Sequence, residues 1–183
     1  MNRVIAGQVS LIACFAVYMV WWYRGYRPGV VVSRAGGLNG VLLLAMVVLG
    51  AVGVWLSTTE IPATSTPVLE PSTIAVGAVI AYIVLLLVTR FLFGRVVTTE
   101  LILIVAWTAL EVSVIVSLNT AGILVGGRFL AMCVVLAAAF IVSVVLYVAY
   151  YRMEEMRAFY AAIAPLVAAA VSMAVLIVLA CVR

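Results

Sequence analysis

Six long apolar runs account for most of the 183-residue chain. A helix needs about 20 mostly apolar residues to cross the hydrocarbon core of a bilayer. Lipid offers no hydrogen-bond partners to the backbone, so such runs form helices. The runs cover roughly residues 4–23, 37–56, 73–93, 99–118, 123–150 and 158–182. The sequence therefore predicts an all-α integral membrane protein, a bundle of six transmembrane helices with short loops, forming a single polytopic domain over residues 1–183.

The composition excludes a water-soluble fold. Hydrophobic residues make up 69% of the chain and charged residues 9%, whereas a soluble domain has about 45–50% apolar and about 25% charged residues. Disorder is also excluded, because it needs low hydrophobicity and high charge. We therefore expect membrane lipids around the protein and no nucleic-acid partner. The apolar composition is also compatible with a homo-oligomer or with partner membrane subunits.

The kinds of charged residue exclude several classes of enzyme. All ten basic residues are arginine, all six acidic residues are glutamate, and the chain has no histidine. Without histidine, neither a Ser-His-Asp triad nor an ordinary zinc site can form, and without lysine no Schiff base can. The cysteines, Cys14, Cys133 and Cys181, are too widely spaced for a CxxC redox motif. We expect no metal, no cofactor and no enzymatic activity.

The distribution of arginine predicts the orientation of the chain. Six spans place seven arginines on one side of the membrane and three on the other, and arginine is enriched on the cytoplasmic side. Both termini are therefore predicted to lie on the outer side. The short chain with tight loops favours the plasma membrane of a bacterium. The seven arginines of the predicted cytoplasmic side are Arg24, Arg27, Arg34, Arg90, Arg95, Arg152 and Arg157.

Glu111 lies deep inside the fourth apolar run. A carboxyl group at that depth is costly, must face protein or a water-filled cavity, and is a functional candidate by default. Trp107 precedes it by four residues and shares its helix face, so the indole ring can shield the carboxyl group. Such a group suits proton coupling or cation binding. The alternative is a neutral, hydrogen-bonded glutamate that joins two helices.

Arg128 is the natural partner for this carboxyl group. If the chain turns at Asn119 and Thr120, the two residues lie at the same depth of an antiparallel helical hairpin, where pairing would lower the cost of burying both. Alternatively, the segment AGILVGG at 121–127 is a loop or re-entrant segment, and Arg128 lies at the membrane surface. The three glycines of this segment favour the alternative. Glu111, Trp107 and Arg128 are the predicted ion-binding or substrate-binding residues.

A second charged group flanks the predicted cytoplasmic ends of the third and fourth runs. It consists of Arg90, Arg95 and Glu100. These residues either anchor the helix ends at the interface or form a cytoplasmic gate or a contact with lipid head groups. In the last run, Pro165 is predicted to kink the helix.

Three classes of function fit these features. The first is a transporter, channel or substrate-binding permease subunit that uses Glu111 as a proton or cation coupling site. The second is a non-catalytic accessory or assembly subunit of a larger membrane complex. The third, ranked lowest because the sequence shows no nucleophile–base pair, is a membrane enzyme acting on lipid. A water-accessible cavity that reaches Glu111 would favour transport, and a tightly packed Glu111 would favour an accessory role.

Overall fold

The fold is all-helical in the residues that the computed structural model describes, which are 2–27, 37–58, 70–94 and 99–182. A π-helical segment, η1 (Val88–Leu92), extends α3, and a 3-10 turn, η2 (Tyr150–Arg152), follows α5. The α-helices are α1 (Asn2–Tyr26), α2 (Gly37–Thr58), α3 (Pro71–Leu87), α4 (Thr99–Thr120), α5 (Gly127–Ala149), α6 (Glu155–Ala161) and α7 (Ala164–Cys181).

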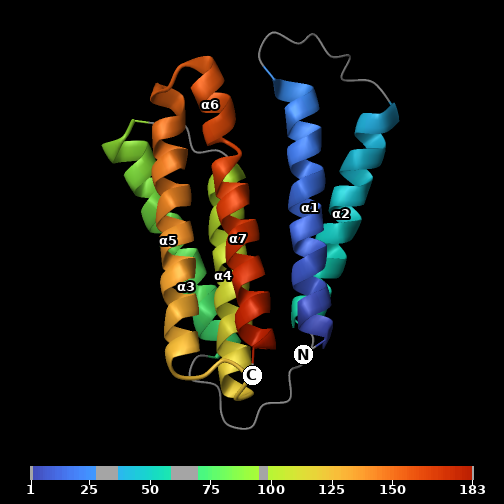
Figure 1. The fold of residues 1–183 in the computed structure, drawn as a ribbon. Helices are drawn as coiled ribbons and strands as arrows, with labels where there is room; N and C mark the ends of the chain where they lie inside the picture. The colour runs from blue at the N-terminus through green and yellow to red at the C-terminus, as the bar shows by residue number, and fades with distance from the viewer. Residues whose placement is uncertain (1, 28–36, 59–69, 95–98, 183) are drawn as a thin grey trace.

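Six segments are long and apolar enough to cross a membrane, when η1 is counted with α3 and α6 with α7. The predicted six-span helical membrane protein is thereby confirmed. The two chain termini lie at the same end of the bundle, and α6 lies at the opposite end (Figure 1). We call these the terminal end and the α6 end. Which of them faces the cytoplasm stays a prediction from the arginine distribution.

The sixth span is broken where the sequence predicts a kink. Pro165 occupies the first turn of α7, where a missing backbone N–H costs least. Helix α6 has ended at Ala161, and the chain changes direction before α7 begins (Figure 1). The prediction of a kink at Pro165 is confirmed, and the break separates the short α6 from the long α7.

Helices α1 and α2 form a very close antiparallel pair. A Cβ atom added to Gly7 would lie 2.4 Å from Oγ of Ser57, so only glycine allows this approach. Further along, the Ser10 hydroxyl donates to the carbonyl of Leu49 at 2.9 Å. Small side chains let helices in lipid approach until such backbone contacts form. The pair therefore behaves as one structural unit.

The remaining helices form a second unit beside the α1–α2 pair (Figure 1). At the terminal end, α1, α4, α5 and α7 share one hydrophobic core, which consists of Val4, Val114, Ile115, Leu118, Leu124, Met132, Leu136 and Leu176. At the α6 end, a smaller core around Leu101, Ile104 and Tyr147 joins α4 to α5 and α3. There α1 meets α6 through rings, with the Trp22 and Phe159 centroids 6.3 Å apart. The two units thus touch near both ends of α1.

Candidate functional site

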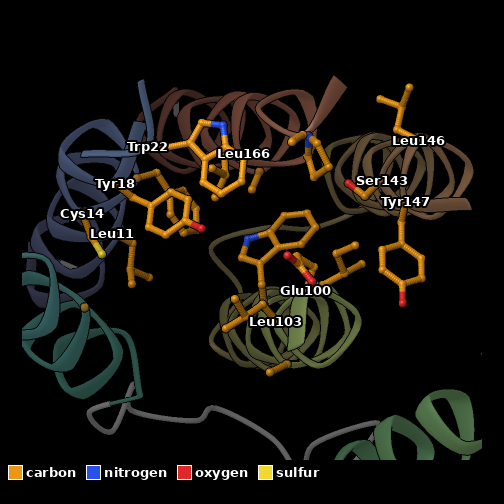
Figure 2. Close-up of a pocket in the computed structure, with 18 of the residues that line it drawn as sticks. Leu11, Cys14, Tyr18, Trp22, Glu100, Leu103, Ser143, Leu146, Tyr147 and Leu166 are labelled. Atoms are coloured by element: carbon orange, nitrogen blue, oxygen red, sulfur yellow. The ribbon is translucent and has the colours of Figure 1, made fainter. Parts of the chain in front are cut away.

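A cavity of about 620 Å³ lies between the α1–α2 pair and helices α4, α5 and α7. This volume is in the range of small-molecule binding sites. Its lining is almost entirely aliphatic and aromatic, and Figure 2 shows Tyr18, Trp22 and Leu103 among the side chains that line it from different helices. The residues nearest the α6 end include Trp22, Glu100 and Tyr150. Those nearest the terminal end include Leu11 and Leu110, which form the floor.

Glu111 lies directly beyond this floor. Its side chain is fully buried, with 0% exposure, and it does not itself line the cavity, whereas Leu110 and Trp107 do. Neither carboxyl oxygen has a hydrogen-bond partner of normal geometry among the described residues. The predicted deep burial of Glu111 is therefore confirmed, and its immediate neighbour along α4, Leu110, belongs to the cavity wall.

Gln8 and Ser57 complete a buried polar layer around this carboxyl group. The amide of Gln8, on α1, lies beside the Glu111 carboxyl, although the contact falls short of normal hydrogen-bond geometry. Nε2 of Gln8 donates to Oγ of Ser57 at 3.5 Å, while its Oε1 has no partner among the described residues. Both side chains are nearly fully buried. Gln8 and Ser57 belong to the α1–α2 pair and Glu111 belongs to the second unit, so this polar layer lies where the two units meet.

Trp107 lies where the sequence predicts it, on the same face of α4 as Glu111 and one turn nearer the α6 end. It is half-buried and lines the cavity. Its indole Nε1–H has no acceptor among the described residues. The structure thus brings Trp107 and Glu111 together at the boundary between the cavity and the polar layer.

Arg128 lies apart from Glu111, so the structure does not form the buried ion pair. The chain turns through residues 121–126, with positive φ at Gly122 and Gly126, and Leu124 of this turn is buried in the core. This places Arg128 in the first turn of α5, where its guanidinium donates to the carbonyls of Leu179 and Val182 near the end of α7. The glycine-rich loop interpretation is the one that agrees with this geometry.

The substitutions Glu111→Gln and Arg128→Gln are therefore expected to act additively on stability. Arg128→Gln should lower the free energy of unfolding by about 1–2 kcal/mol, because it removes charged donors from carbonyls at the end of α7. The measurement is a double-mutant cycle by unfolding in one detergent, with the exposed Arg152→Gln as the matched control. A coupling energy above about 0.5 kcal/mol between the two sites would restore the direct pair.

The structure does not bring Arg90 and Glu100, the described residues of the second charged group, together at one site. Glu100, in the first turn of α4, lines the mouth of the cavity. Arg90 is exposed on η1 and does not line it, and Arg95 lies outside the described residues. Of these three, Glu100 is thus the residue that the structure joins to the cavity.

Gln8 and Ser57 are not among the predicted site residues, and the sequence predicts neither the place of the cavity nor most of its lining. Gln8 is polar within an apolar run, as Glu111 is, and this shared feature was the available signal. Ser57 carried none, because a serine near the end of a span is ordinary. The cavity depends on how α1 and α2 stand against the other helices, which the hydropathy of single runs does not encode.

The chain has no significant match among family models, curated proteins or solved structures. The chemistry of the site follows from its own donor and acceptor atoms. Three buried acceptor oxygens, one on Gln8 and two on Glu111, have no donor among the described residues. A buried layer with surplus acceptors can take up a proton or a cation. This layer lies next to a cavity large enough for a small molecule.

Proposed function

We propose that this protein is a small non-enzymatic transporter, or the substrate-binding subunit of one, in which Glu111 couples substrate movement to the binding of a proton or cation. One observation carries the proposal: the buried carboxyl group of Glu111, whose oxygens have no hydrogen-bond partner of normal geometry among the described residues, is next along α4 to Leu110 and one turn from Trp107, and both of these line a cavity of small-molecule size. Ionisable groups inside a membrane mark ion pathways and proton relays. Substrate in the cavity would contact Trp107 and Leu110 of α4, and the proton would bind to Glu111 of the same helix. The two binding events would thus affect one helix.

The arrangement of the helices supports a mechanism of alternating access. Substrate would occupy the cavity while the two units are closed at the terminal end around Val4 and Leu176. Protonation of Glu111 allows it to donate to Oε1 of Gln8, across the boundary between the units. Rocking of the α1–α2 pair would then open the terminal end and close the cavity at the α6 end. Movements of one helical unit against another are common in transporters.

The proposed setting is the plasma membrane of a bacterium, with the α6 end in the cytoplasm, following the arginine distribution. Lipids would surround the bundle. Helix α3 buries almost none of its residues, which supports an additional contact there with a second copy of the chain or with a partner membrane subunit.

An accessory role is the second candidate. It is favoured by the complete burial of Glu111 and by its absence from the cavity lining. In that role the carboxyl group would join α4 to α1 through Gln8, and the cavity would hold lipid. Loss of the carboxyl group would then weaken the fold without affecting any flux.

Proteoliposomes that contain the full chain and the pH-sensitive dye pyranine test the proposal. A panel of small organic cations, anions and neutral solutes is added in turn, and proton movement is recorded. We expect one class to drive proton movement, and we expect Glu111→Gln to abolish it because an amide cannot carry the exchanged proton. Glu155→Gln, which changes an exposed glutamate of α6, is the matched control. Proton movement that is equal in Glu111→Gln, or absent for every class, would overturn the proposal.

A further inference from the structure

The geometry points to a lipophilic organic cation as the molecule that the cavity binds, an inference that rests on the proposed transport function. It follows from three features of the described residues: the aromatic lining of the cavity, the sign of its charge, and its route to the lipid.

Six aromatic residues belong to the cavity lining. They come from four segments, and ring faces attract organic cations within about 6 Å through their quadrupole. The remaining lining is aliphatic, so a bound molecule must itself be largely apolar. The aromatic residues of the lining are Phe15, Tyr18, Trp22, Trp107, Tyr147 and Tyr150, of which Tyr147 has its ring buried in the core around Leu101 and Ile104.

The charge of the cavity is negative. Among the described residues that line it, Glu100 is the only charged one, and it forms no ion pair with another described residue. Figure 2 shows the side chains of Glu100 and Tyr18 directed into the cavity from opposite helices. Glu111 adds a second carboxyl group beyond the floor. A cation is attracted and an anion repelled by this arrangement, the more so because the walls are apolar.

The cavity also reaches the surface that faces lipid. Val54 on α2 and Leu103 on α4 both line it, yet they are 43% and 59% exposed. Exposed apolar side chains at these positions lie against acyl chains in a membrane. A molecule dissolved in the bilayer would then enter between α2 and α4 without crossing water, which again favours a lipophilic solute.

A neutral molecule or a lipid acyl chain would use the apolar walls but not the carboxylate. The test therefore compares two ions of nearly the same size and shape, the tetraphenylphosphonium cation and the tetraphenylborate anion. Binding to the purified full-length protein in detergent is measured by calorimetry, with protein-free micelles subtracted. We expect the cation to bind at least about tenfold more tightly than the anion.

The variant Glu100→Gln identifies the group that selects the charge. We expect it to weaken binding of the cation about fivefold, the effect of a partly screened charge pair at an exposed site, and to leave or improve binding of the anion. Glu155→Gln is again the control and should change neither. Equal binding of both ions, tighter binding of the anion, or unchanged cation binding in Glu100→Gln would overturn the inference.

These outcomes are separable from the fate of the proposed function. If anions or neutral solutes drive Glu111-dependent proton movement while tetraphenylphosphonium does not bind, the substrate class is wrong and the transport proposal stands. If tetraphenylphosphonium binds through Glu100 but no solute drives proton movement, the binding site stands and the transport proposal fails.

Discussion

Replacing Glu111 with leucine is expected to stabilise the protein and to abolish the proposed proton-coupled transport at the same time. The Glu111 side chain is fully buried and its oxygens have no partner of normal geometry among the described residues. A buried polar group in that state costs about 1–3 kcal/mol, which leucine, similar in length and apolar, would recover. The free energy of unfolding should rise by that amount, and the midpoint of thermal unfolding by several degrees.

The measurement is thermal unfolding of the wild type and Glu111→Leu in one detergent, beside the proton-movement assay. Glu100→Leu is the matched control, since it makes the same chemical change on the same helix at an exposed position and should bring no gain in stability. A loss of more than about 1 kcal/mol in Glu111→Leu would show that the carboxyl group joins helices through hydrogen bonds. That result would favour the accessory role, because stability and function would then fall together instead of opposing each other.

Gly7→Ala is expected to destabilise the protein by about 1–3 kcal/mol through overpacking. The new Cβ would lie 2.4 Å from Oγ and 2.6 Å from the backbone nitrogen of Ser57, and a backbone atom cannot move aside as the end of a side chain can. Helix α2 would have to shift as a whole. Because Ser57 accepts the hydrogen bond from Gln8, the shift would also disturb the polar layer and reduce the proposed transport.

Two other glycines provide the controls for this effect. A Cβ on Gly50, of the same helix pair, would meet only Sγ of Cys14 at 3.5 Å, and one on Gly77 of α3 would meet nothing within 4 Å. Gly50→Ala and Gly77→Ala should leave the unfolding midpoint unchanged or slightly raised, since alanine favours a helix more than glycine does. If all three variants behave alike, the close approach of α1 to α2 is not what holds the pair together.

The sequence was sufficient for those features that depend on one helix at a time. Run length and hydropathy predicted the six spans, Pro165 predicted the break, and the depth of Glu111 within its run predicted its burial. Features that depend on two distant segments were not predictable in this way. Arg128 binds carbonyls at Leu179 and Val182, more than 50 residues away, and the position of Gln8 beside Glu111 joins residues more than 100 apart.

Of the two interpretations of Arg128, the ion pair with Glu111 fails for a local physical reason. A turn centred on Asn119 and Thr120 would have placed it deep in the membrane, but the chain uses six residues between the helices. Gly122 and Gly126 supply the positive φ values that this longer turn needs, and Leu124 is buried in the core within it. The glycines were visible in the sequence. The burial of Leu124, which fixes the turn at that length, was not.

The close pairing of α1 with α2 has a consequence for biosynthesis. Helices α1 and α2 precede α4 in the chain, so the ribosome delivers them before it, and the contacts through Gly7 and Ser10 join these two helices to each other. Gln8 and Ser57 can therefore stand ready in the membrane, already bonded to each other, before α4 leaves the insertion machinery. The helix that carries Glu111 would then meet a polar edge instead of bare lipid, and this order of synthesis would lower the barrier to inserting its most costly side chain.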